Sequence, residues 1–184
     1  MYEVEIKVEL TEDEKGKLVD SFKERGFLSK GTTPQCDFWI EAKESEYGGY
    51  DIKRYRMEGD KYFYTEKMWE LCNGNPVRKE NEHEVPKEEY DSKRREFPEV
   101  LSIKKDREWF AGNYKGEDIS ITIDSVKFDH SPSVRYFIEA EIGITNKEDF
   151  AKTREFIEDF LKEILNRTEI VDAPGIFKMV FKKL

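Results

Sequence analysis

The chain has 184 residues, enough for one domain with a substantial core, and aromatic residues make up 14% of it. Its 41 acidic and 32 basic residues give a net charge of −9, which argues against nucleic acid as a partner because sequence-independent binding relies on clustered lysine and arginine. No apolar leader opens the chain and no apolar stretch approaches the ~20 residues of a membrane span, so we expect a soluble, cytoplasmic protein without a membrane partner.

From Tyr2 onward the first strand's residues alternate between apolar and charged side chains, which predicts a β-strand over Met1–Leu10. Successive side chains of a strand point to opposite faces, so Glu3, Glu5 and Lys7 share one face. Two interpretations fit this pattern. A half-buried antiparallel strand with a solvated outer face shows the same alternation. Two carboxylates beside an ammonium group also suit a site for Mg²⁺ and phosphate.

A helix follows the first strand, because Thr11 and Glu14 form a capping box and Gly26 provides a stop after about Arg25. Alternating patterns bounded by turn residues then predict three strands. These strands are Tyr50–Glu58, Tyr62–Trp69 and Val77–Val85. A weakly helical segment, Lys87–Glu96, ends this half of the chain, since Pro98 cannot continue it.

The second half is predicted to contain more strands and a long amphipathic helix. The strands are Val100–Phe110, Asp118–Phe128 and Tyr136–Gly143, the helix spans about Lys147–Asn166, and a short helix begins at Pro174. Seven or eight antiparallel strands with a few helices indicate the α+β class and a closed or nearly closed sheet, which removes exposed edges. Nothing indicates a second domain within residues 1–184.

Charges of one sign gather on the polar face of each later strand. The basic faces carry Arg54 with Arg56, Lys67 alone, and Lys105 with Arg107; the acidic faces carry Glu80, Glu82 and Glu84, then Asp124, then Glu139 with Glu141. A solvated face would mix both signs. Charges that point into a barrel need partners, and divalent cations for carboxylates or phosphates for guanidinium groups would supply them.

The opening Glu3-x-Glu5-x-Lys7 resembles the ExExK signature of the CYTH superfamily, the triphosphate tunnel metalloenzymes, which includes class IV adenylate cyclases and thiamine triphosphatases. The later charged motifs follow in the family's order over almost the whole chain. The resemblance therefore implies an eight-stranded antiparallel β-barrel with flanking helices. Its tunnel would bind a triphosphate (ATP, thiamine triphosphate or inorganic triphosphate) with one or two divalent ions, Mg²⁺ or Mn²⁺.

The resemblance also implies roles for individual residues. The implied metal ligands are Glu3, Glu5, Glu139 and Glu141, with Asp124 assisting. The implied catalytic and phosphate-binding cations are Lys7, Arg54, Arg56, Lys67 and Arg107. Lys105 joins these cations as a substrate-binding residue, and Glu82 is a further candidate on a strand whose three carboxylates leave the inward one unassigned.

The substrate and reaction stay open at this point. The Tyr2–Lys7 run is closest to cyclase-like members, which favours conversion of ATP to cyclic AMP and pyrophosphate. A triphosphatase acting on thiamine triphosphate, tripolyphosphate or a nucleoside triphosphate is the alternative. A non-catalytic polyphosphate- or nucleotide-binding module and a purely structural β-domain are two others. Gly175-Ile176-Phe177 replaces the family's common Ser-Tyr segment, which puts substrate choice in question; a homodimer is one option for the assembly.

Overall fold

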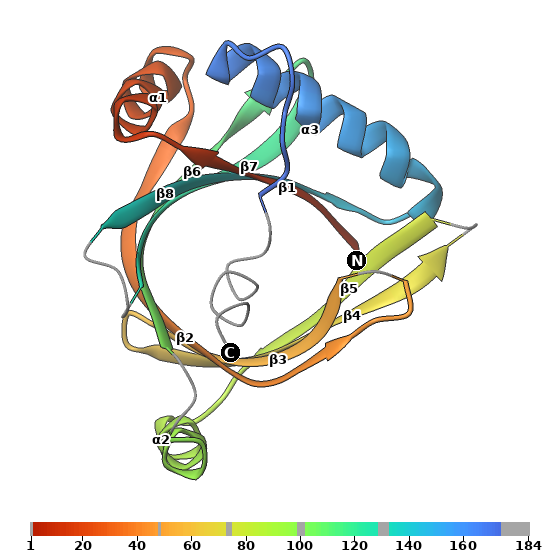
Figure 1. The fold of residues 1–184 in the computed structure, drawn as a ribbon. Helices are drawn as coiled ribbons and strands as arrows, with labels where there is room; N and C mark the ends of the chain where they lie inside the picture. Colours follow the sequence, from red (N-terminus) through yellow and green to blue (C-terminus); the bar gives the residue numbers. More distant parts are fainter. Residues whose placement is uncertain (1, 48, 73–74, 99–101, 129–132, 174–184) are drawn as a thin grey trace.

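The computed structural model describes residues 2–47, 49–72, 75–98, 102–128 and 133–173. These residues form one eight-stranded antiparallel sheet, in the order β1-β8-β7-β6-β2-β3-β4-β5, that curls around a central space (Figure 1). The strands are β1 (Tyr2–Leu10), β2 (Leu28–Glu44), β3 (Tyr50–Glu58), β4 (Lys61–Cys72), β5 (Asn75–Glu84), β6 (Ser102–Tyr114), β7 (Glu117–Phe128) and β8 (Val134–Ile144). The helices are α1 (Glu12–Glu24), α2 (Lys87–Glu96), the 3₁₀ turn η1 (Lys147–Asp149) and α3 (Phe150–Leu165). The predicted α+β class and eight-stranded antiparallel sheet are confirmed.

The two end strands of the sheet, β1 and β5, meet through side chains. The described residues form no backbone ladder between these strands, and the Arg78 guanidinium of β5 instead reaches the Glu5 carboxylate of β1 at 2.7 Å. Further along β1, the segment after α3 approaches the main chain of Lys7. The Ala173 N–H donates to the Lys7 carbonyl at 2.6 Å, and the Lys7 N–H donates to Asp172 Oδ1 at 3.3 Å. Among the described residues, the Arg78–Glu5 pair therefore bridges the seam, and the segment after α3 binds the main chain of β1.

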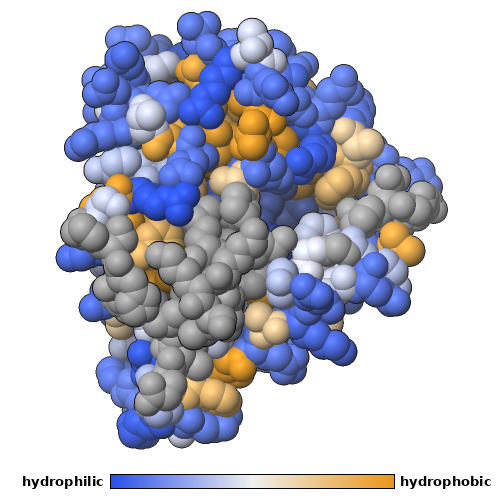
Figure 2. Space-filling view, in the orientation of Figure 1, coloured by the Kyte–Doolittle hydropathy of each residue, from blue (hydrophilic) through white to orange (hydrophobic). Residues whose placement is uncertain are grey.

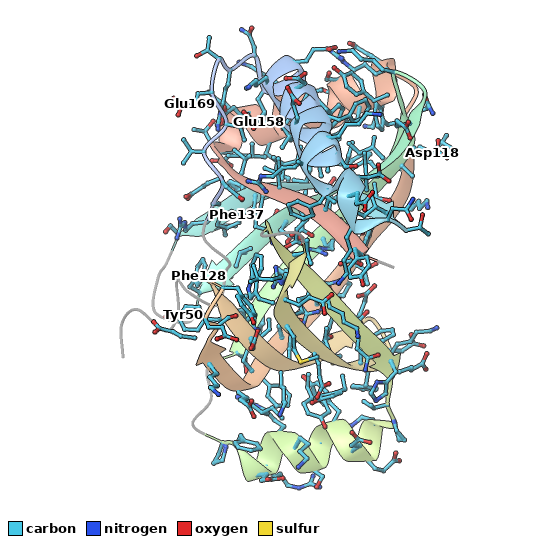
Figure 3. All side chains as sticks on the ribbon, turned by 90° about the vertical axis from the view of Figure 1, so that its right-hand side faces the viewer. Tyr50, Asp118, Phe128, Phe137, Glu158 and Glu169 are labelled. Atoms are coloured by element: carbon cyan, nitrogen blue, oxygen red, sulfur yellow. The ribbon has the colours of Figure 1, made fainter. Side chains whose placement is uncertain are left out.

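The apolar face of β1, β8, β7 and β6 points outward, beneath α1 and α3. Val4, Ile6 and Val8 of β1 are buried there against Phe22 of α1 and Phe160 of α3. The helix α2 covers the opposite side of the barrel, where Tyr90 packs with Phe38 and Tyr55 (Figures 1 and 3). Apolar side chains come to the surface between α1 and α3 in Figure 2, on a face that is otherwise mainly hydrophilic. Because the helices cover the apolar face, the charged face of each strand points into the barrel.

No helix in the described ranges combines the length and the apolar character needed to cross a bilayer.

Strand β2 has no counterpart among the elements predicted from the sequence, because Gly31 and Pro34 interrupt its pattern. Gly31 lies at a register shift in the β2–β6 ladder and has a φ of +92°, which glycine adopts readily. The β2–β3 ladder begins only at Gln35, opposite Glu58, so the missing N–H of Pro34 removes no hydrogen bond from it. The Pro34 carbonyl accepts from the Gly59 N–H in the β3–β4 turn at 3.1 Å. Both breaking residues are thus accommodated inside a 17-residue strand.

The other predicted elements match the observed ones within a few residues, with β6 running on to Tyr114. The short helix predicted from Pro174 and the Gly175-Ile176-Phe177 segment lie outside the described residues.

Candidate active site in the barrel lumen

A cavity of about 220 Å³ lies inside the curled sheet and is lined almost entirely by charged side chains. Seven carboxylates and seven cations line it: Glu3, Glu5, Asp37, Glu80, Glu82, Glu139 and Glu141, with Lys7, Arg54, Arg56, Lys67, Arg78, Lys105 and Arg107. These include every site residue predicted from the sequence except Asp124, which lies buried behind Arg107 and Lys105. The alternative interpretation, in which these faces are solvated outer faces, is therefore wrong.

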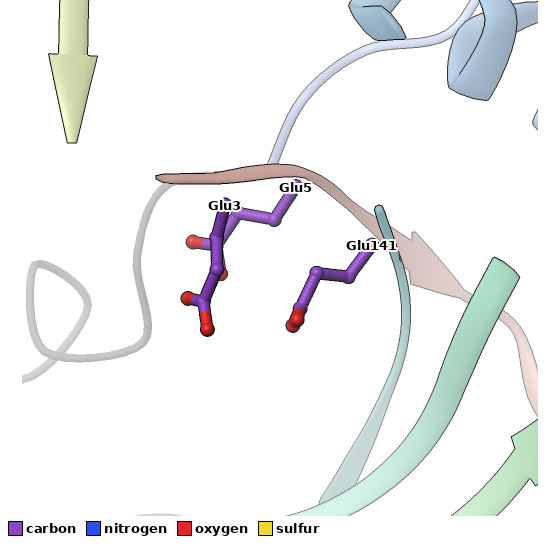
Figure 4. Close-up of side chains that lie close together, drawn as sticks. All are labelled: Glu3, Glu5 and Glu141. Carbon is purple, nitrogen blue, oxygen red and sulfur yellow. The ribbon is translucent and has the colours of Figure 1, made fainter. Parts of the chain in front are cut away.

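Three of the predicted metal ligands form a carboxylate cluster where β1 meets β8. Glu5 and Glu141 are direct partners in the β1–β8 ladder, and Glu3 lies two residues along β1 on the same face. One carboxylate oxygen from each residue lies within 4.8 Å of the other two (Figure 4). Oxygen donors at this spacing fit a hard divalent cation such as Mg²⁺ or Mn²⁺.

Electrostatics explain why this cluster would take up a cation. Burial raises the pKa of Glu3 to about 8, and the carboxylates of Glu80 and Glu141 add to the shift. Burial together with Glu139 and Glu5 raises the pKa of Glu141 to about 7. Without a cation the cluster therefore retains protons near neutral pH. A divalent ion would displace those protons and relieve the repulsion.

Glu139 and Asp124, the other two predicted metal ligands, are engaged by protein cations instead. The Arg107 guanidinium forms a two-pronged pair with Asp124, with Nε and Nη2 each donating at 2.7 Å, and its Nη2 also reaches Glu139 at 3.4 Å. The ammonium of Lys7 pairs with Glu139 as well. Burial alone would raise the pKa of Glu139, but Lys7 and Arg107 hold it well below its usual range. Both carboxylates therefore orient cations that are predicted to bind phosphate, and a metal role for either carboxylate also stays a prediction.

The facing wall, on β2 and β3, is organised around Asp37. This buried carboxylate accepts from Arg56 at 2.7 and 3.2 Å and lies 3.7 Å from both Arg54 and Lys105. Burial opposes ionisation, yet Arg56, Arg54 and Lys105 lower the pKa of Asp37 far below its usual range. Sequence analysis missed Asp37 because it missed β2, the strand whose alternation would have placed this residue inside.

Strands β4 and β5 complete the lumen and show which carboxylates of β5 point inward. Lys67 pairs with Glu80, and Glu82 accepts from Arg54 at 3.3 Å and from the Thr65 hydroxyl at 2.7 Å. Glu84 instead forms an exposed pair with Lys61 at 3.5 Å. Glu80 and Glu82 therefore both line the cavity.

The pKa shifts predict that the metal-free protein loses stability as pH rises from about 5 to 7. With raised pKa values, Glu3 and Glu141 keep protons in the folded state that the unfolded chain releases, and the state with more bound protons is disfavoured as pH rises. Burial and Arg107 lower the pKa of Lys105 to about 7. Above that pH the folded state has lost a proton that Lys105 keeps in the unfolded chain, so Lys105 favours folding as pH rises. This contribution opposes that of Glu3, and stability should change little between pH 7 and 8.

Thermal unfolding in EDTA across this pH range would measure the effect. The Glu3→Gln variant should show a shallower fall than the parent protein. An unfolding temperature that climbs steadily from about pH 5 to 8 would contradict the prediction.

The chain resembles known proteins in sequence and in fold. No protein-family model matches the chain. A candidate adenylate cyclase of Methanocaldococcus jannaschii is 30% identical over 168 residues, 89% of this chain and 90% of the relative. This identity extends over most of both chains and shows kinship beyond a shared fold.

Two solved structures share the architecture. A Pyrococcus horikoshii protein superimposes with a TM-score of 0.68 and 19% identity, covering all of both chains. A candidate adenylyl cyclase from Hippeastrum, described as having a dominant triphosphatase activity, superimposes with a TM-score of 0.62 and 18% identity, covering 100% of this chain and 97% of its own. At these identities the likeness establishes the fold alone.

Proposed function

Because this chain belongs to the CYTH superfamily, we propose that it binds a triphosphate in the barrel lumen with a divalent cation, Mg²⁺ or Mn²⁺, and transforms it chemically. The observation that carries the proposal is the convergence of seven cations and a three-carboxylate cluster in one cavity. A binding module or a structural β-domain would not require both sets, since buried charge is costly unless it is paired.

Phosphate oxygens can join the carboxylates that already pair with the luminal cations. Arg54, Arg56 and Arg107 are held by Asp37, Asp124 and Glu82, so their guanidinium groups are oriented before a ligand arrives. A planar guanidinium donates to two phosphate oxygens at once, whereas Lys7, Lys67 and Lys105 supply point charges. The triphosphate would thus gain charge-assisted hydrogen bonds without much rearrangement of the site.

Glu3, Glu5 and Glu141 would hold the divalent cation. When bound, such an ion neutralises charge on phosphate oxygens and lowers the pKa of an attacking hydroxyl or water. Lys7 and Arg107 both reach Glu139, which lies two positions from Glu141 on the same face of β8. They would stabilise negative charge that develops on the phosphoryl group under attack. The protein's contribution is therefore positioning and charge neutralisation.

The favoured reaction is that of a class IV adenylate cyclase, in which the ribose 3′-hydroxyl of ATP attacks the α-phosphorus and pyrophosphate leaves. The name of the M. jannaschii relative supports this choice. Hydrolysis of a triphosphate to phosphate and a diphosphate is the second candidate. The triphosphatase activity described for the Hippeastrum protein supports it, since that protein also carries a cyclase name.

Product analysis tests the proposal. Purified protein would be incubated with Mg²⁺ or Mn²⁺ and, separately, with ATP, thiamine triphosphate and tripolyphosphate. Cyclic AMP with pyrophosphate identifies a cyclase, and free phosphate identifies a triphosphatase and its substrate. Arg54→Ala should lose the activity, while Arg25→Ala, which changes an exposed arginine outside the lumen, should keep it. If no product formed in any mixture, the proposed enzymatic activity would be refuted.

A further inference from the structure

Arg78 of β5 differs from the other luminal cations in the carboxylate that it pairs with. Its Nη1 donates to Glu5 Oε1 at 2.7 Å, across the seam between β5 and β1. Glu5 belongs to the three-carboxylate cluster (Figure 4). The other two members, Glu3 and Glu141, form no salt bridge within the described ranges. Arg78 is therefore a counter-ion that the protein itself supplies to the cluster.

The six other luminal cations are held by carboxylates outside the cluster. Their partners are Asp37, Glu80, Glu82, Asp124 and Glu139. The side chains of these six cations are 3–15% exposed, whereas that of Arg78 is 25% exposed. A cation in the cluster would leave their pairs intact, but it would have to share Glu5 with Arg78.

The indole of Trp69 supports the Arg78 guanidinium without competing for its hydrogen bonds. The guanidinium carbon lies 5.9 Å from the centre of the ring. The backbone of Gly49, with a φ of +78°, packs so closely on this ring that a Cβ there would lie 2.7 Å from Nε1. Asp51 accepts from the Trp69 N–H at 2.8 Å. A planar guanidinium can stay beside a fixed aromatic ring while the N–H groups at its edge change partner.

Arg78 also has donors to spare. In the part of the chain that the structure describes, Glu5 is its one salt-bridge partner, and its buried Nε makes no hydrogen bond. A guanidinium carries five N–H groups, so most of those of Arg78 are available to a ligand. Because Arg78 lines the cavity, an anion in the lumen could reach these groups.

We propose that Arg78 is an exchangeable counter-ion, which neutralises Glu5 in the empty protein and passes to an anionic ligand in the lumen, so that Glu5 becomes available to the divalent cation. This inference rests on the proposed function and adds a linkage between two ligands. A guanidinium that contacts a carboxylate repels a cation bound by the same carboxylate. The anion should therefore raise the affinity for the cation, and by thermodynamic reciprocity the cation should raise the affinity for the anion. Arg78 is thus a positioning residue that acts through Glu5.

Mn²⁺ binding tests this role without requiring turnover. Free Mn²⁺ would be measured by electron paramagnetic resonance in titrations of the parent and of Arg78→Gln, in chloride and then in sulfate at equal ionic strength. Sulfate stands in for phosphate, and a protein-free blank corrects for its own association with Mn²⁺. In chloride, Arg78→Gln should bind Mn²⁺ about tenfold more tightly than the parent, because a positive charge beside the cluster is gone. Sulfate should tighten Mn²⁺ binding about fivefold in the parent and less than about twofold in Arg78→Gln.

Two controls separate this pair from general charge. Arg78→Lys keeps the positive charge and should bind Mn²⁺ within about twofold of the parent. Lys147→Gln removes a positive charge from a side chain of similar exposure, 26%, that pairs with Glu70 and does not line the cavity. It should change the Mn²⁺ affinity by less than about twofold.

The fold should survive the substitution, since the Arg78–Glu5 pair is partly exposed. Urea unfolding in EDTA would verify this. Arg78→Met, which keeps an apolar contact with Trp69, takes the place of Arg78→Gln if the glutamine variant unfolds.

Two results would overturn the inference while leaving the proposed function intact. Arg78→Gln could bind Mn²⁺ no more tightly than the parent, which would make Arg78 an aid to Glu5 in cation binding. Sulfate could also raise the Mn²⁺ affinity by the same factor in the parent and in Arg78→Gln. If neither the parent nor any variant binds Mn²⁺ in either salt, the divalent-cation part of the proposed function fails and takes the inference with it.

Discussion

Replacing Arg107 with alanine is expected to remove most of the activity and to destabilise the fold. Arg107 is the partner of Asp124, a carboxylate that is only 1% exposed, and it also reaches Glu139. Removing one partner of a buried ion pair leaves an uncompensated charge and costs about 3–5 kcal/mol of unfolding free energy. An arginine that neutralises a transferring phosphoryl group contributes roughly 10³-fold to turnover, so kcat/KM should fall by about this factor.

Urea unfolding and turnover of the preferred triphosphate would measure the two effects. Adding Asp124→Asn to Arg107→Ala should recover part of the stability without restoring activity, because the buried carboxylate is gone but the cation is still missing. Arg107→Lys should keep more stability than alanine yet remain impaired, since an ammonium cannot form the two-pronged pair. The exposed control Arg25→Ala should change stability by less than about 0.5 kcal/mol. An Arg107→Ala protein with parental stability and activity would contradict this account.

Glu141→Gln is expected to weaken divalent-cation binding by about 100-fold or more, because it removes a charged ligand from a three-carboxylate cluster. The same substitution should raise the unfolding temperature of the metal-free protein at pH 8. Burial together with Glu139 and Glu5 disfavours the charged form of Glu141, and an amide relieves that repulsion. Gain of stability with loss of metal affinity is the opposite of what a structural carboxylate would show.

Electron paramagnetic resonance of free Mn²⁺ would measure the affinity, and thermal unfolding in EDTA would measure the stability. Glu84→Gln, on the same kind of strand but in an exposed pair with Lys61, should alter neither quantity. Equal Mn²⁺ affinity in the parent and in Glu141→Gln would exclude this carboxylate as a ligand.

Strand alternation allowed much of the site to be predicted from the sequence. In β1 every second residue is charged and the residues between are apolar, so the shared face of Glu3, Glu5 and Lys7 followed directly. In β8 Glu139 and Glu141 alternate with apolar residues in the same way and therefore share a face. What alternation could not decide was whether the charged faces turn inward or outward. The direction of the charged faces depends on α1 and α3 covering the apolar face. This packing joins segments that are distant in the sequence, so local alternation does not reveal it.

The parts that sequence reasoning missed depend on contacts between distant segments. Gly31 and Pro34 obscured β2, so neither the strand nor Asp37 was found, although Asp37 organises three luminal cations. Arg78 was passed over because its partner Glu5 lies across the seam between the two end strands.

The most direct test of the central claim is a calorimetric titration of imidotriphosphate, a hydrolysis-resistant inorganic triphosphate, into the protein in Mg²⁺ and again in EDTA. If the luminal cations and the carboxylate cluster act together, binding should saturate at one site per chain and be at least about tenfold tighter in Mg²⁺. Equal affinity in Mg²⁺ and EDTA, or no binding in either buffer, would contradict the account.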